Sequence, residues 1–117
     1  MPDLNPIFTA RFNSGDAAAL SELYEKDAVF HTPAGPVSGR EAIRTMYAAM
    51  LADSPTIDSE ARRILICGDI ALIISEWSFT SGDSGDATSS GISVEVARRQ
   101  PDGTWLYIID EPRIPRH

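Results

Sequence analysis

Hydrophobic and polar positions follow two different periods in the two parts of the chain. Up to about residue 52, apolar side chains recur three and four residues apart, the spacing of amphipathic helices. From Thr56 onward they alternate with polar side chains, the period typical of strands. Helices are therefore expected near residues 6–12, 17–24 and 40–52. Strands are expected at residues 28–32, 57–67, 70–80, 88–100 and 104–110.

Capping and turn residues mark the ends of these segments. Small polar side chains that can accept backbone N–H bonds precede the helices, namely Asn5, Asp16 and the capping box of Ser38 and Glu41. Turns are expected at residues 33–36, 68–69 and 101–103, and the polar stretch 81–87 is expected to be a hairpin tip. These boundaries agree with the change in period.

The order of the elements predicts the fold class. Helices come first and a run of strands joined by short turns follows, which is typical of an α+β domain. We expect a curved, mostly antiparallel sheet wrapped around the three helices, with a cavity between the two layers. The whole chain, residues 1–117, has the size of one such domain.

Composition and charge narrow the possible partners. The chain has 17 acidic and 10 basic residues, a formal net charge of −7, so nucleic acid is not expected as a partner. No apolar run approaches the roughly 20 residues of a membrane span, and the N-terminus lacks the pattern of a signal peptide. With one cysteine, Cys67, no intrachain disulfide can form. The expected location is the cytoplasm, away from membranes.

The strand expected at residues 70–80 has apolar residues on both faces. One face carries Ala71, Ile73, Ser75, Trp77 and Phe79, and the other carries Ile70, Leu72, Ile74, Glu76 and Ser78. A strand with one solvated face would alternate more cleanly. We expect one face to line the cavity. The other face is expected to meet a second copy of the chain, which would give a homodimer through the outer face of the sheet.

Four short motifs carry a resemblance to a known family. They are Gly15-Asp16, Tyr24-x-x-Asp27-Ala28, Pro33-x-Gly35 and Gly39-Arg40-Glu41-x-Ile43. With these motifs, the stretch 5–47 resembles the ketosteroid isomerases and their SnoaL-like polyketide-cyclase relatives, within the NTF2-like superfamily. The resemblance implies the NTF2-like, or cystatin-like, fold with a cone-shaped apolar pocket. It does not specify the reaction, since this fold hosts many activities.

Ketosteroid isomerases move a proton between carbons beside a carbonyl, using three groups at known motif positions. The resemblance places their aspartate base at Thr32, which cannot act as a base near neutral pH. It places the tyrosine that donates to the oxyanion at Phe8, which has no hydroxyl. The acidic donor corresponds to Glu95, which keeps a carboxyl group. Steroid isomerisation by that route is therefore not expected.

Glu95 and Asp110 are the candidate catalytic carboxyls. On adjacent antiparallel strands they could be neighbours. Two neighbouring carboxyls in an apolar pocket would have different pKa values, so that one could act as an acid and the other as a base. Alternatively, one of them faces water or is neutralised by an arginine. His31, beside Thr32, is either a catalytic proton shuttle at the mouth of the pocket or a surface or core histidine.

The expected cavity wall consists mainly of aromatic and flexible side chains, which suit a flat apolar ligand. The candidate binding residues are Phe8, Phe12, Thr32, Met46, Tyr47, Trp77, Phe79, Ser93 and Ile108. Without a cavity, the large apolar ones would simply be core. Tyr47 is preferred to Tyr24 as a substitute for the missing hydroxyl donor. The sequence has no His-x-x-x-His motif, cysteine pair or glycine-rich phosphate loop, so neither a metal nor another cofactor is expected.

Two functions are compatible with these features. The first is a protein that binds an apolar small molecule and performs isomerase- or cyclase-like acid–base chemistry with Glu95 and Asp110. The second is a non-catalytic dimeric ligand-binding or interaction module, whose pocket is vestigial or binds a ligand without turnover. An enzyme should have a carboxyl of raised pKa in an open cavity, whereas a vestigial module should have a filled pocket and solvated or ion-paired carboxylates.

Overall fold

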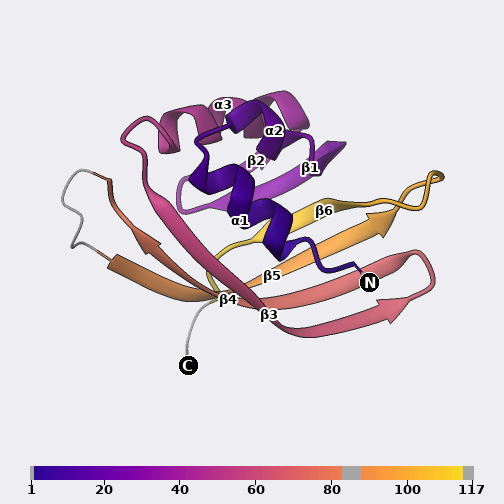
Figure 1. Ribbon diagram of the computed structural model, residues 1–117. Coiled ribbons are helices and arrows are strands. Elements are labelled where there is room, and N and C mark those ends of the chain that lie inside the picture. Colours follow the sequence, from indigo (N-terminus) through magenta and orange to yellow (C-terminus); the bar gives the residue numbers. More distant parts are fainter. Residues whose placement is uncertain (1, 83–87, 115–117) are drawn as a thin grey trace.

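The computed structural model describes residues 2–82 and 88–114, and it consists of a curved sheet with helices on one side (Figure 1). The helices are α1 (Asn5–Asn13), α2 (Ala17–Ser21) and α3 (Arg40–Met50). The strands are β1 (Tyr24–Thr32), β2 (Gly35–Ser38), β3 (Thr56–Cys67), β4 (Ile70–Thr80), β5 (Thr88–Arg99) and β6 (Trp105–Glu111). The predicted hairpin tip at 81–87 lies largely outside the described residues.

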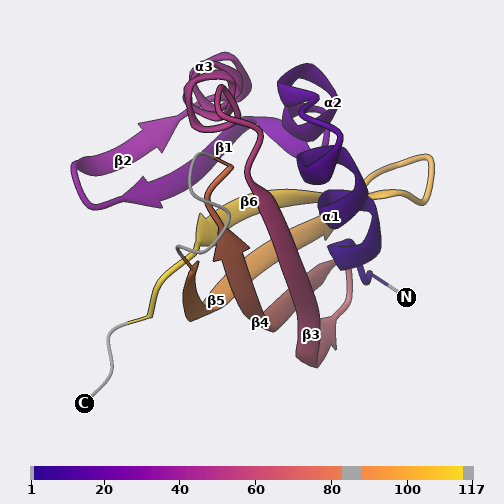
Figure 2. The ribbon, with the colours of Figure 1, turned by 60° about the vertical axis from the view of Figure 1, so that its left-hand side comes forward.

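The six strands form one sheet in the order β2-β1-β6-β5-β4-β3. Neighbours are antiparallel except β1 and β6, which pair in parallel. In Figures 1 and 2 the long strands β3 to β6 bend beneath the helices, and α1 crosses their concave side. The predicted α+β class, with three helices on a curved and mostly antiparallel sheet, is confirmed. No helix among the described residues is long and apolar enough to cross a membrane.

Two differences from the predicted elements occur near β1. The second helix ends at Ser21, and Tyr24 begins a strand although it continues the helical stripe. Pairing with β6 accounts for this difference, because Tyr24 lies opposite Tyr107 and the Tyr107 N–H donates to the Leu23 carbonyl over 2.7 Å. The turn is shorter than the expected range 33–36, because Gly35–Ser38 forms the edge strand β2. An edge strand can accommodate a proline, here Pro36.

One of the three expected helix caps is present. The Asp16 carboxylate accepts a bond of 2.9 Å from the Ala19 N–H, as predicted. Asn5 instead lies inside α1, and its side chain reaches toward the sheet. The capping box before α3 is absent because Ser38 ends β2, and Gly39, with φ of 95°, takes the N-cap position without a side-chain bond.

The core fills one end of the space between the helices and the sheet. Its fully buried large side chains come from all three helices, from β1 and from the inner face of the sheet: Phe12, Leu20, Tyr24, Ile43, Tyr47 and Ile73. Along β4 the inner residues Ala71, Ile73 and Ser75 are buried. The face of β4 that carries Ala71, Ile73 and Ser75 is therefore the one that faces the helices.

Candidate functional site

A cavity of about 550 Å³ lies between the helices and the inner face of the sheet. Its wall combines side chains of α1 and α3 with those of the long strands and of the segment after β6. The lining residues are Asn5, Phe8, Phe12, Phe30, His31, Thr32, Pro33, Met46, Tyr47, Met50, Ile57, Ser59, Trp77, Phe79, Ser89, Ser93, Glu95, Tyr107, Asp110, Glu111, Pro112 and Arg113. The size suits a drug-sized ligand, and the wall is mainly apolar.

Every residue that the sequence analysis selected for the site lines this cavity, except Ile108. Their assigned roles stay predictions. Thr32 lines the cavity, and its hydroxyl is committed to the β1–β2 turn, where it donates to the Gly35 carbonyl over 2.7 Å. Phe8 is a wall residue on α1, in edge contact with Tyr47 across 6.3 Å between ring centroids.

The selection of Ile108 as a residue of the cavity wall was wrong, because β6 contains a bulge. Val96 pairs with Ile109 and Ala97 pairs with Tyr107, which leaves Ile108 as the extra residue. A bulge reverses the alternation of faces along the strand. Tyr107 and Asp110 therefore both line the cavity, although strict alternation places them on opposite faces.

The two candidate carboxyls lie side by side in the sheet. Glu95 on β5 is the register partner of Asp110 on β6, and each residue is 6% exposed. Within the described part of the chain, no ion pair joins either of them to an arginine, lysine or histidine. The alternatives in which one faces water or is neutralised by an arginine are therefore not realised among these residues.

Glu95 is held by hydroxyl groups. The Ser75 hydroxyl donates to Glu95 Oε1 over 3.0 Å, and the Asn5 amide donates to the Ser75 and Ser59 oxygens over 3.0 and 2.7 Å. Burial raises the pKa of Glu95, and the hydrogen bonds from Ser93 and Ser75 oppose that rise. Asn5 thus joins α1 to the strand that supports the carboxyl.

Asp110 is held by tyrosines. The Tyr24 hydroxyl donates to Asp110 Oδ2 over 2.6 Å, and the hydroxyls of Tyr24 and Tyr47 are 2.7 Å apart. Burial raises the pKa of Asp110 well above its usual range, and the nearby charge of Glu95 raises it further, while the Tyr24 bond opposes the rise. The two carboxyls therefore titrate as a pair, and both retain protons to higher pH than free carboxyls do.

The tyrosines of the site are donors of hydrogen bonds. Burial, reinforced by the charge of Asp110, raises the pKa of Tyr24 and of Tyr47 well above the usual value. Both hydroxyls stay protonated at physiological pH. Tyr47 lines the cavity and Tyr24 does not. Because Tyr24 donates to Asp110, the proton of Tyr47 is directed to the Tyr24 oxygen.

Sequence reasoning missed several wall residues. Asn5 was interpreted as a helix cap because asparagine before a helical proline is a common cap pattern. Strict alternation along the last strand would place Tyr107 on the face opposite to Asp110, so it was not selected. Ser59 carried no signal, since an isolated serine in a strand is ordinary. An early sign for Tyr107 could have been the mixed apolar content of both faces of the last strand.

The mouth of the cavity is formed where β1 and the end of β6 approach one another. His31 Nδ1 lies 2.6 Å from Glu111 Oε2, and the histidine side chain is 56% exposed. The Trp77 indole N–H donates to the Pro112 carbonyl over 2.7 Å, and the Arg113 guanidinium lies 5.2 Å from the Trp77 ring centroid. His31 is thus at the mouth, paired with a carboxylate. Across residues 2–82 and 88–114, no group of three or more His, Cys, Asp or Glu side chains could hold a metal ion.

Comparison with known proteins gives one family. The model of the SnoaL-like domain family matches residues 7–117 of the chain. No curated protein matches the sequence significantly. The matched range includes the cavity residues from Phe8 to Arg113.

Solved structures with the same fold support this match. A protein of unknown function with a cystatin-like fold from Nostoc punctiforme is 18% identical, with a TM-score of 0.82 over 97% of this chain and 86% of that chain. A ketosteroid isomerase-like protein from Erwinia carotovora atroseptica is 18% identical, with a TM-score of 0.71 over 93% and 89% of the two chains. An NTF2-like protein from Novosphingobium aromaticivorans is 26% identical, with a TM-score of 0.75 over 94% and 76%. The NTF2-like fold is thereby confirmed.

Proposed function

The chain belongs to the SnoaL-like domain family, and from that premise and the geometry of the cavity we propose that it binds an apolar small molecule and acts on it by isomerase- or cyclase-like acid–base chemistry. One observation carries the proposal: two buried carboxyls without a cationic partner among the described residues lie side by side in an open, mainly apolar cavity. Such a pair costs stability, which a purely structural module would have no reason to accept.

The environments of the two carboxyls suggest different roles. Glu95 accepts bonds from Ser75 and Ser93, which favour its charged form, so it is the base. We assign the proton of the pair to Asp110, because burial and the adjacent charge of Glu95 both raise the pKa of Asp110. In the ketosteroid isomerases that the chain resembles, the position of Glu95 holds the acidic donor. The role proposed here for Glu95, that of the base, is the reverse.

The proposed reaction is the transfer of a proton beside a carbonyl. Glu95 removes a proton from a carbon next to the carbonyl of the ligand, and the electron pair moves onto the carbonyl oxygen. The protonated Asp110 donates a hydrogen bond to that developing oxyanion, while Tyr47 donates to Tyr24 and Tyr24 donates to Asp110, which supports the donor from behind. If a C=C bond is conjugated with the enolate, Glu95 returns the proton to the far carbon of that system and the C=C bond shifts, which is isomerisation. Alternatively, the enolate carbon attacks a second carbonyl, whose electron pair moves onto its oxygen and takes up the proton from Glu95, which is cyclisation.

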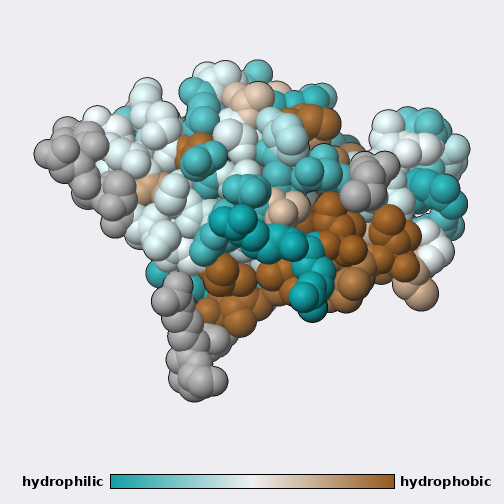
Figure 3. Space-filling model, turned by 60° about the horizontal axis from the view of Figure 1, so that its bottom comes forward, coloured by the Kyte–Doolittle hydropathy of each residue, from teal (hydrophilic) through white to brown (hydrophobic). Residues whose placement is uncertain are grey.

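The outer face of the sheet supports the dimer that forms part of the second candidate, a non-catalytic dimeric module. Register partners place Leu65, Leu72, Val96 and Ile109 in one row across β3, β4, β5 and β6. Figure 3 shows apolar side chains gathered on this underside, and Leu65 and Ile109 are 57% and 48% exposed. We propose that this row, called the outer band, is the interface of a homodimer. A dimer is compatible with either function.

The experiment that tests the enzyme proposal follows both binding and chemistry. Thermal shift at pH 5 and pH 8 with steroids, aromatic polyketide-like ketones and fatty acids identifies ligands, since a ligand of the folded state raises the melting temperature. For each ketone that binds, exchange of the hydrogens beside its carbonyl is then followed by NMR in heavy water. We expect exchange with the wild type, its loss in Glu95→Gln, and no change in the surface control Glu41→Gln. Binding without exchange would favour the non-catalytic module.

A further inference from the structure

The end of β6 and the residues after it run along the cavity wall toward its mouth. Asp110, Glu111, Pro112 and Arg113 all line the cavity, and Asp110 is buried whereas Arg113 is exposed. Two bonds hold the segment against the sheet. The Pro112 carbonyl accepts from the Trp77 indole over 2.7 Å, and the Ile114 N–H donates to the Ile92 carbonyl over 3.0 Å. Arg113 is therefore presented from an anchored backbone.

Arg113 rests on a platform built by Trp77 and Gly91. Gly91 is the register partner of Trp77, and a Cβ on Gly91 would lie 2.7 Å from Trp77 Cζ2, so the indole ring occupies the space that a side chain would take. The Arg113 guanidinium lies 5.2 Å from the centroid of that ring. A guanidinium that stacks on an aromatic face keeps its N–H donors free in its own plane.

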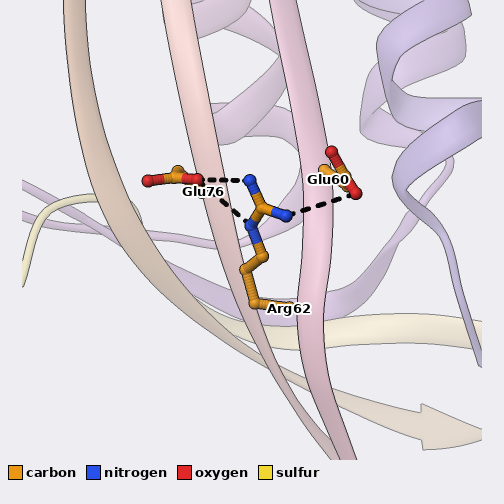
Figure 4. Close-up of polar contacts among 3 residues, drawn as sticks. All are labelled: Glu60, Arg62 and Glu76. Atoms are coloured by element: carbon orange, nitrogen blue, oxygen red, sulfur yellow. Dashed lines mark hydrogen bonds and ion pairs between the residues drawn. The ribbon is translucent and has the colours of Figure 1, made fainter.

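Among the described residues, Arg113 forms no ion pair, whereas Arg62, Arg98 and Arg99 do. Arg62 bridges Glu60 and Glu76 on the surface (Figure 4), and Arg98 and Arg99 pair with Glu25 and Asp69. In the described chain, no carboxylate pairs with Arg113. The other basic group in the cavity wall, His31, is engaged by Glu111.

We infer that Arg113 anchors a carboxylate of the ligand at the mouth of the cavity, and that the substrates are therefore flat apolar carboxylic acids. The inference rests on the proposed function, because it names the substrate class of the same cavity. Arg113 lies three positions after Asp110, so their Cα atoms are at most about 11 Å apart. A rigid body of two or three fused rings spans that distance. Its carbonyl lies at the carboxyl pair while its carboxylate meets the guanidinium fork.

The charge of the protein makes this contact specific. With a net charge of −7 the protein repels anions in general, so a preference for an acid has to come from a local contact. Arginine is suited to that contact, because its planar fork matches a carboxylate with two parallel hydrogen bonds.

The test compares matched ligands that differ only in charge. Isothermal titration calorimetry at pH 7 measures the affinity of 9-fluorenone-2-carboxylic acid and of its carboxamide for the wild type, Arg113→Gln, Arg113→Lys and the surface control Arg44→Gln. We expect the wild type and Arg44→Gln to bind the acid about tenfold more tightly than the amide. Arg113→Gln should lower the affinity for the acid by about that factor and leave the affinity for the amide unchanged. The affinity of Arg113→Lys for the acid should lie between those of the wild type and Arg113→Gln.

Two results would overturn the inference while leaving the proposed function intact. One is equal affinity of the wild type for the acid and the amide. The other is an equal loss of affinity for both ligands in Arg113→Gln. That result would mean that Arg113 supports the cavity wall and does not recognise the charge of the ligand. If neither compound binds to the wild type, the result counts against the proposed function as well as against the inference.

Discussion

Substituting Gly91 by alanine tests how rigidly the cavity wall holds the Trp77 ring. Gly91 has no positive φ, so alanine is compatible with its backbone. The added Cβ would lie 2.7 Å from Trp77 Cζ2 and 3.1 Å from Cε2, closer than real contacts allow. The ring cannot simply move away, because its N–H is bonded to the Pro112 carbonyl and Arg113 covers its face.

The expected cost follows from three contributions. Overpacking of this kind costs about 1–3 kcal/mol. Loss of the bond between the indole and Pro112 adds about 1 kcal/mol. Alanine restricts the unfolded chain, which offsets about 0.4–1 kcal/mol. We therefore expect Gly91→Ala to lower the free energy of unfolding by about 1–4 kcal/mol.

Urea unfolding followed by circular dichroism measures this change, with the exposed neighbour Ser90→Ala as a control that should have little effect. A double-mutant cycle identifies the cause. In a Trp77→Leu background the clash is gone, so Gly91→Ala should be neutral or slightly stabilising. The same cost in both backgrounds would refute the proposed contact and, with it, the platform on which Arg113 is argued to rest.

Three further predictions concern the carboxyl pair and the outer band. The raised pKa of Asp110 means that the folded state holds a proton which the unfolded state releases above about pH 4, so the wild type should lose stability as pH rises beyond that value. Asp110→Asn should show a smaller loss between pH 4 and pH 8 in thermal unfolding, and an unchanged slope would contradict the shift. Tyr24→Phe removes a hydroxyl bonded to Asp110 and Tyr47 and should cost about 1–3 kcal/mol in urea unfolding, whereas a cost near zero would mean that this network contributes little. Leu72→Glu places a charge in the outer band and should convert the proposed dimer to a monomer in light scattering; a wild type that is already monomeric would rule out the interface.

The sequence was informative wherever local structure follows from short-range chemistry. The alternation of side chains predicted β3 to β5 to within about a residue, because the faces of a strand follow directly from its pleat. The cap at Asp16 was predicted because a carboxylate bonds to backbone N–H groups only a few residues away. Half of the residues in the cavity wall were identified through the resemblance and the choice of faces that it supported.

The errors occurred where distant contacts override local preference. Tyr24 continues a helical stripe, yet pairing of β1 with β6 places it in a strand. Asn5 has the pattern of a cap, yet its amide bonds to serines 54 and 70 residues further along the chain. The bulge at Ile108 adds one residue to the strand without a turn residue to announce it. None of these contacts can be seen in a window of neighbouring residues.

By itself, the sequence determined the fold class, the positions of most elements and the presence of two acidic residues on adjacent strands. Only the tertiary structure decided that Glu95 and Asp110 are register partners in an open cavity, and that serines hold one while tyrosines hold the other. Their raised pKa values depend on removal of water by residues from several elements, and on a separation that a single bulge can change. The proton affinity of a buried carboxyl is thus a property of the whole packed domain, whereas the period of a strand belongs to a few consecutive residues.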